Sequence, residues 1–249
     1  MPNSLTHVAI MKELEKEKPE LFSNIDKKYF YSGTVFPDIN YLVPRKAKKN
    51  LSFYWHRTRK ATLDFARIML KLAKTKQEKS FALGFLSHAI IDEYIHKYLD
   101  KNKLFEIKHI VLEYFLDLEY AYKIQKIKWL PWCIYPKKIL CLALEQDKEK
   151  RLISNINFNF FHRISYVITI KILQSRIKTR YNNKKERKFN LINLLLNIFF
   201  KKSKYEFKLN INELLHPDFK LKEKHLKNLI SVLENAKKEF AKEMKKFNS

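Results

Sequence analysis

Glycine is nearly absent from this chain: Gly33 and Gly84 are the only two among 249 residues. The phosphate-cradling loops of Rossmann and P-loop proteins need two or three glycines at short fixed spacings, because the backbone must approach the phosphate closely. Gly33 and Gly84 stand too far apart to form either pattern. The sequence therefore excludes a nucleotide-binding loop, and we expect no nucleotide cofactor.

Cysteine is also scarce, and Cys133 and Cys141 form neither a CxxC pair nor a disulfide framework. Any zinc in this chain must therefore be held by nitrogen and oxygen ligands. Long apolar runs are missing as well. Charges begin at Lys12, and the most apolar run, 189–200, spans twelve residues that include three asparagines, whereas a membrane-spanning helix needs about 20 residues. We expect a cytoplasmic protein without a signal peptide, for which peripheral membrane contact stays open.

Positive charge is abundant and unevenly distributed. The net charge is +25, of which residues 121–249 carry +19. Such a basic region attracts polyanions, either phospholipid head groups or nucleic acid. A compositional bias explains the charge equally well, because 42 of the 51 basic residues are lysine. The charge alone does not choose between these interpretations.

Helical periodicity dominates the chain, and we expect an all-α fold with a single multi-helix domain. The predicted helices are 3–17, 52–74, 78–99, 106–127, 151–176, 189–200 and 217–246. We expect a loop between the first two, because it contains Gly33 and Pro37. We assign residues 1–128 to a metal-binding helical catalytic core, and residues 129–249 to a basic helical C-terminal region packed on that core.

Histidines and carboxylates recur at helical spacing between residues 88 and 113. His88, Asp92 and His96 stand four apart in GFLSHAIIDEYIH, so they project from one side of a helix. His88 and His96 are about 12 Å apart along the axis, too far to share one ion, but Asp92 lies between them and could bridge two. His109 and Glu113 repeat the spacing on the next helix. A single such histidine is more often a core residue, but the combination favours a cluster of metal ions that binds a phosphodiester.

These motifs belong to a longer series that runs THVAIMKEL, GTVFPDI, WHRT, GFLSHAIIDEYIH and HIVLEYFLDLEY over residues 6–120. The series resembles the zinc-dependent phospholipase C family, whose fold is shared with zinc-dependent single-strand nucleases. The resemblance implies a helical hydrolase with two to three zinc ions. Four residues would surround one ion: Asp38, His56, His88 and Asp92. Three would hold a second ion with an open position for water or substrate: His96, His109 and Glu113. His7 would serve a third ion, bridged to the first by Asp92.

The resemblance also assigns roles beyond the ligands. Asp38 would be the general base that orients a zinc-activated water, and Asp117 would support the ligands. Phe53 matches an aromatic residue of the choline pocket. The chain departs from the secreted members of the family in beginning Met1-Pro2 instead of with a ligating tryptophan. In addition, Ile39 replaces an aromatic residue after Asp38, and no acidic residue precedes His7. Phosphatidylcholine is therefore not the expected substrate.

Three functions follow from this sequence. The leading one is a phospholipase C-like phosphodiesterase that cleaves phospholipid head groups by metal-activated water. A zinc-dependent single-strand nuclease would use the same metal set, with aromatic side chains that stack bases and a basic track. A protein that binds anionic membranes without catalysis would use the apolar run 189–200 between its basic flanks. The expected partners are accordingly phospholipid or an anionic membrane surface, with nucleic acid as the alternative.

Overall fold

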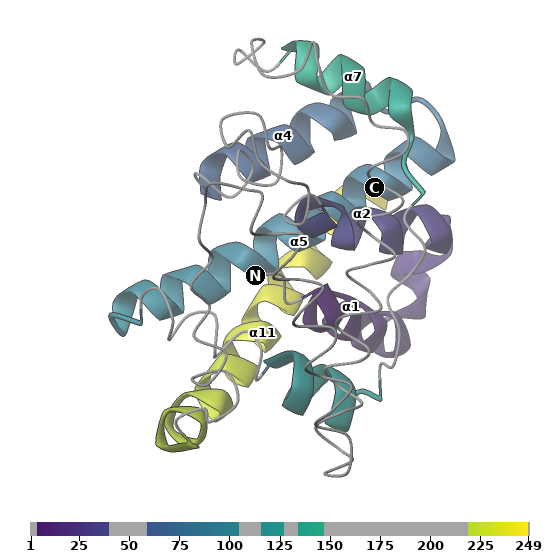
Figure 1. Ribbon diagram of the computed structural model, residues 1–249. Helices are drawn as coiled ribbons and strands as arrows, with labels where there is room; N and C mark the ends of the chain where they lie inside the picture. Colours follow the sequence, from purple (N-terminus) through teal and green to yellow (C-terminus); the bar gives the residue numbers. More distant parts are fainter. Residues whose placement is uncertain (1–3, 40–58, 105–115, 127–133, 147–218, 249) are drawn as a thin grey trace, which may run out of the picture.

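The computed structural model describes residues 4–39, 59–104, 116–126, 134–146 and 219–248, and these contain helices and no strand (Figure 1). The all-α expectation is therefore confirmed. In chain order the elements are α1 (Ser4–Glu17), η1 (Pro19–Phe22), α2 (Lys27–Ile39), α4 (Arg59–Leu72), α5 (Lys76–Lys101), η4 (Leu116–Ile124), α7 (Lys137–Gln146) and α11 (Phe219–Asn248).

Helix α5 is the centre of the bundle and packs against α2, α4 and α11. Its start is fixed by a capping box: the Thr75 hydroxyl accepts from the Glu78 backbone N–H at 3.2 Å, and the Glu78 carboxylate accepts from the Thr75 N–H at 3.0 Å. From Ser80 to Ile91 every side chain is buried. A helix that is buried on all sides in its middle can present polar residues to an interior site, provided that these have partners there.

Each of the two glycines faces the backbone of the other helix where α2 crosses α5. A Cβ atom on Gly84 would overlap the carbonyl oxygen of Phe30, and a Cβ atom on Gly33 would overlap that of Phe81. The two helices therefore touch through their backbones, closer than any larger residue permits. The site described below begins within one turn of this crossing, so the close approach sets its dimensions.

The predicted loop after the first helix is wrong in its central part, because residues 27–39 form α2. Glycine costs about 1 kcal/mol in a helix, and Pro37 cannot bond to the carbonyl four residues earlier. These local signals are overridden by packing: Phe30, Val35 and Phe36 are buried in the core. Gly33 is needed for the crossing with α5, and Pro37 lies in the last turn, where it interrupts little of the helix.

Part of the predicted helix 106–127 has a different helix type from the expected α-helix. The structure describes residues 116–126 of this range. Residues Leu116–Ile124 are π-helical, and the Gln125 N–H donates to the Tyr120 carbonyl five residues back at 2.9 Å. Apolar periodicity does not distinguish this wider turn from an α-helix. It packs mainly against α1, with which Asp117 and Tyr120 form hydrogen bonds, and it also contacts α11.

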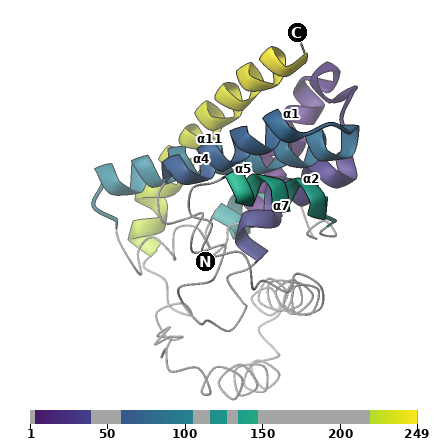
Figure 2. The same ribbon diagram turned by 90° about the horizontal axis from the view of Figure 1, so that it is seen from above.

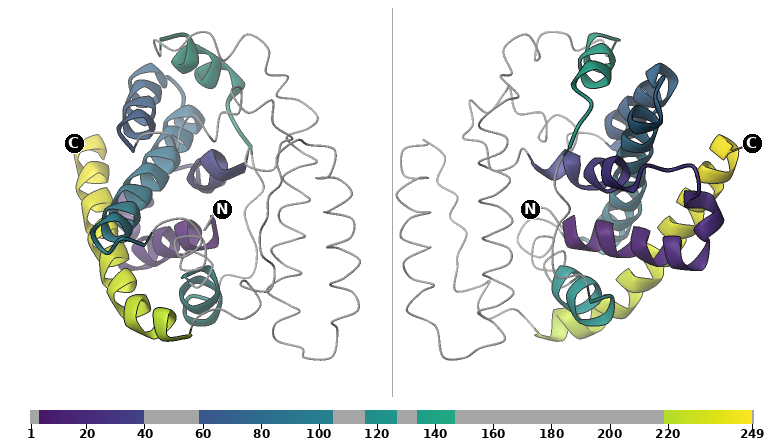
Figure 3. Two further views of the ribbon diagram at one scale, coloured as in Figure 1. Left: turned by 60° about the vertical axis from the view of Figure 1, so that its left-hand side comes forward. Right: turned by 90° about the vertical axis from the view of Figure 1, so that its right-hand side faces the viewer.

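The described parts of the predicted C-terminal region 129–249 are 134–146 and 219–248. Helix α7 packs on α4, and α11 packs on α5 and α1 (Figures 2 and 3). The domain boundary at residue 128 stays a prediction, since 127–133 lie outside the described residues. The predicted helices 151–176 and 189–200 also lie outside the described residues. Among the described helices none is both long and apolar enough to cross a membrane.

Helix α11 is joined to α1 by a buried lysine. Lys237 is 3% exposed, and its Nζ lies 2.8 Å from Glu17, 2.9 Å from Glu234 and 3.3 Å from Glu13. Burial alone would lower the pKa of Lys237, but the hydrogen bonds to Glu17 and Glu234 and the charge of Glu13 outweigh it and raise the pKa. The ammonium group is therefore charged and fully compensated.

Replacing Lys237 by methionine is expected to lower the free energy of unfolding by about 2 kcal/mol at pH 7, because three carboxylates then face each other without their cation. The folded pKa lies above the unfolded value of 10.5, so this stabilisation is complete below pH 10.5 and is lost as the pH rises through the folded pKa. Urea unfolding of both proteins across this range measures it. Lys242→Met is the control, since Lys242 pairs with Glu239 at the surface and should change stability by no more than about 0.5 kcal/mol.

Candidate metal centre

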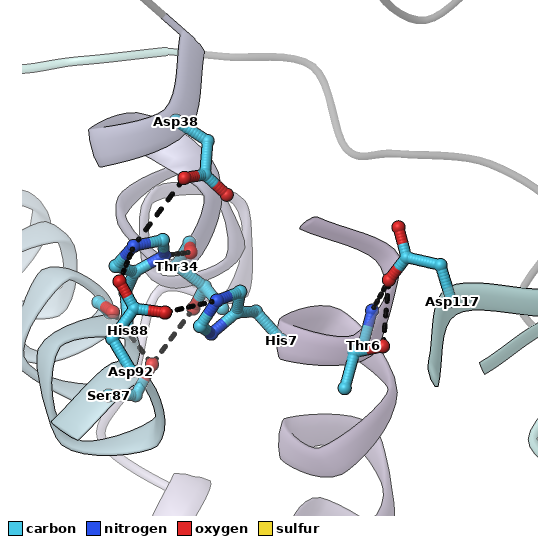
Figure 4. Close-up of polar contacts among 9 residues, drawn as sticks. Thr6, His7, Thr34, Asp38, Ser87, His88, Asp92 and Asp117 are labelled. Carbon is cyan, nitrogen blue, oxygen red and sulfur yellow. Dashed lines mark hydrogen bonds and ion pairs between the residues drawn. The ribbon is translucent and has the colours of Figure 1, made fainter. Parts of the chain in front are cut away.

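Two histidines and an aspartate from α1 and α5 meet in the interior of the bundle. His7 Nε2 lies 3.2 Å from Asp92 Oδ1, and His88 Nε2 lies 3.2 Å from Asp92 Oδ2 (Figure 4). The two imidazole rings are stacked with their centroids 4.0 Å apart. One potential ligand atom from each residue lies within 4.8 Å of the others, and no other such group of three or more occurs in the described parts of the chain.

The orientation of His88 is fixed by a backbone contact with α2. Its Nδ1 lies 2.9 Å from the carbonyl oxygen of Thr34. A carbonyl only accepts, so Nδ1 carries a proton, and in the neutral ring Nε2 then presents a lone pair. Metal-binding histidines are usually held in this way, through a hydrogen bond from the nitrogen that does not bind the metal. The same Nε2 lies 3.7 Å from Asp38 Oδ1, which comes from the last turn of α2.

His7 is fully buried, and neither of its ring nitrogens has a hydrogen-bond partner among the described residues. The 3.2 Å contact with Asp92 is close enough for an ion pair but lacks hydrogen-bond geometry. Burial, together with the nearby His88, lowers the pKa of His7 and outweighs the opposite effect of Asp92 and Asp38. The ring is therefore neutral near pH 7, with a buried lone pair whose lack of a partner costs about 1–3 kcal/mol.

This set of donors fits zinc. Neutral imidazole nitrogens and carboxylate oxygens are its ligands where thiolates are absent. The carboxylate of Asp38 is 4% exposed, and that of Asp92 faces both histidines at once. A cation at this point would supply His7 with the partner that it lacks, and it would offset the cost of holding two carboxylates away from water.

The remaining predicted ligands are not part of this group. His96 lies on α5 two turns beyond His88 and is half-buried, outside the three-residue cluster. His56, His109, Glu113 and Phe53 lie outside the described residues. The structure thus brings together His7, Asp38, His88 and Asp92, and the assignment of all eight residues as zinc ligands stays a prediction.

Several polar contacts around the cluster are not evident from the sequence pattern. The Ser87 hydroxyl donates to the Gly84 carbonyl at 2.7 Å and lies 3.2 Å from the Thr34 hydroxyl, so both hydroxyls are used in the α2–α5 contact. Asp117 is buried and accepts from the backbone N–H and the hydroxyl of Thr6, at 2.8 and 2.7 Å. No spacing in the sequence signals this contact, because Thr6 and Asp117 stand 111 positions apart.

The helical fold and the histidine–aspartate cluster agree with a comparison with known families. A family model described as zinc dependent phospholipase C matches residues 6–173, about two thirds of the chain. The chain therefore belongs to the zinc-dependent phospholipase C family. The match extends beyond residue 120, where the recognisable motifs end. No curated protein and no solved structure matches the chain.

Proposed function

We propose that this protein is a zinc-dependent phosphodiester hydrolase that cleaves phospholipid head groups in the manner of a phospholipase C. The observation that carries the proposal is the buried group of His7, His88 and Asp92, with Asp38 beside it, in a member of this family. The substrate would be a phospholipid in an anionic membrane surface.

The residues of the cluster have different proposed roles. Zinc bound there would supply Lewis-acid chemistry and lower the pKa of a water molecule to about 7. His88 is held by Thr34 so that its Nε2 faces the two aspartates. Asp92 offers one oxygen to each histidine, which suits a bridging carboxylate.

Asp38 is placed to act as the general base. It lies in the last turn of α2 beside the cluster, with its Oδ1 3.7 Å from His88 Nε2, so its carboxylate would be within reach of a water molecule bound at the cluster. A serine nucleophile is not indicated, since the hydroxyl of Ser87 is buried and donates to the Gly84 carbonyl. Water is therefore the proposed nucleophile.

The test of this function is a direct comparison of products. The purified chain, loaded with zinc, is incubated with phosphatidylglycerol vesicles and, separately, with single-stranded DNA. We expect release of diacylglycerol and phosphoglycerol from the vesicles and no release of nucleotides. Nucleotide release without diacylglycerol would instead assign a nuclease, and binding to the vesicles without any product would leave a membrane-binding protein.

Replacing Asp38 by asparagine is expected to lower kcat by about 100- to 10,000-fold, the usual effect of removing a general base. Zinc content should stay near that of the parent, because the amide oxygen still faces the cluster. Turnover of vesicle lipid and plasma mass spectrometry measure the two quantities on the same sample. Asp64→Asn, at a half-exposed position on α4 where the carboxylate pairs with Arg67, serves as the control and should leave both unchanged. Unchanged turnover in Asp38→Asn with zinc bound would remove Asp38 from the mechanism.

A further inference from the structure

Asp117 closes a contact between two elements that are distant in the sequence. It lies on η4, is 4% exposed, and its Oδ1 accepts both the backbone N–H and the hydroxyl of Thr6 across 111 positions of the chain. Thr6 belongs to the first turn of α1, where backbone N–H groups have no acceptor within the helix. A carboxylate is a favourable partner there, because the helix dipole is positive at this end.

The next residue along α1 is His7, which the first turn places against the cluster. Its ring stacks on His88 and its Nε2 faces Asp92, but no hydrogen bond among the described residues holds either ring nitrogen. The backbone of this turn therefore decides where the His7 imidazole sits. Figure 4 shows Thr6 and His7 on the same turn, with Asp117 on one side and the cluster on the other.

We propose that Asp117 is the positioning residue for His7, which it holds through Thr6 so that the imidazole meets Asp92. This inference rests on the proposed function and deepens it. In the sequence Asp117 stands four residues after Glu113, and that spacing alone would assign it to the Glu113 ligand set. The contacts with Thr6 instead connect it to the turn that carries His7.

Two substitutions separate the hydrogen bonds from the charge. Both bonds end on Oδ1, so Asp117→Asn can keep them with its amide oxygen, whereas Asp117→Ala removes them. We expect Asp117→Ala to bind zinc at least tenfold more weakly than the parent, at the same site where His7→Ala lowers zinc affinity. Removing a group that orients a metal ligand usually lowers metal affinity about 10- to 100-fold. Asp117→Asn should bind zinc within about threefold of the parent.

Tyr120→Phe is the matched structural control. Tyr120 lies on the same η4 and donates its hydroxyl proton to Glu13, further along the same α1. Its loss weakens the η4–α1 contact without touching the first turn, so we expect lower stability with unchanged zinc binding. Thr6→Val is a milder variant that deletes one of the two bonds to Asp117, and it should show a smaller loss of zinc affinity than Asp117→Ala.

The experiment is a double-mutant cycle on the full-length chain. Zinc per chain is measured by plasma mass spectrometry, zinc affinity by chelator competition, and ligand geometry by the visible spectrum of the cobalt-substituted protein, with urea unfolding alongside. If Asp117 acts through His7, the double variant His7→Ala/Asp117→Ala loses no more zinc than His7→Ala alone. Its cobalt spectrum should also match that of His7→Ala.

The inference would be overturned by full zinc affinity in Asp117→Ala, by a further loss of zinc when Asp117→Ala is added to His7→Ala, or by equal losses in Tyr120→Phe and Asp117→Ala. An equal loss in Asp117→Asn and Asp117→Ala would also overturn it, because charge rather than the bonds to Thr6 would then be the cause. A parent protein that binds no zinc would instead contradict the proposed function, so the two failures are distinguishable.

Discussion

Replacing His88 by alanine is expected to abolish zinc binding at the cluster and lower lipid hydrolysis by about a thousandfold or more. The Nε2 atom of this imidazole lies 3.7 Å from Asp38 Oδ1 and 3.2 Å from Asp92 Oδ2, and its Nδ1 donates to the Thr34 carbonyl. Losing a metal that supplies several kcal/mol of charge stabilisation corresponds to a rate loss of this size. Zinc content and turnover, measured on the same preparation, check the prediction.

His225→Gln is the control for His88→Ala. His225 is also a buried histidine on a core helix, but its Nδ1 pairs with the Tyr98 hydroxyl at 2.7 Å, away from the cluster. We expect His225→Gln to be less stable than the parent and to bind the same amount of zinc. Equal zinc content in His88→Ala and the parent would show that His88 is a core histidine rather than a ligand.

Replacing Gly84 by alanine is expected to lower the free energy of unfolding by about 2 kcal/mol and to lower zinc affinity with it. The added methyl group would overlap the backbone carbonyl of Phe30, which cannot turn away as a side chain could. Overpacking of a core typically costs about 1–3 kcal/mol, and alanine returns only about 1 kcal/mol of helix propensity. Because the methyl group would meet backbone atoms of Phe30 and Thr34, which cannot move aside, we expect the net loss of stability to lie at the upper end of the resulting range.

Zinc affinity should fall as well, because His88 is one turn from Gly84 and takes its orientation from α2. Pushing the helices apart lengthens the contact between the His88 Nδ1 and the Thr34 carbonyl. Gly33→Ala tests the same crossing from the other helix and is expected to behave alike, with the double variant less than additive. Urea unfolding and zinc competition measure both effects. A Gly84→Ala protein as stable as the parent, with full zinc affinity, would refute this account of the crossing.

The sequence predicts the helices that carry strong local signals. The expected helix 78–99 corresponds to α5, whose start is set by the Thr75–Glu78 capping box, and the expected helix 217–246 corresponds to α11. Helix α2 was not predictable in this way. Its glycine and proline oppose a helix locally, and only the crossing with α5 explains why a helix forms there.

The candidate site is likewise only partly predictable from the sequence. The His88–Asp92 pair follows from i, i+4 spacing on one helix, and Asp38 and His7 follow from the family resemblance. The carbonyl of Thr34 that orients His88 is a backbone group, which no residue pattern specifies. The contact of Asp117 with Thr6 joins positions 111 residues apart, so only the folded chain reveals it.

The most direct test of the central claim is the zinc content of the full-length protein, purified without a chelator or a histidine tag and measured by plasma mass spectrometry. The buried lone pair of His7 and the fixed Nε2 of His88 predict tightly bound zinc, with two to three ions per chain if the ligands outside the described residues complete the centre. A chain that holds no zinc, even after reconstitution, would contradict the account and reduce the cluster to a structural feature of the core.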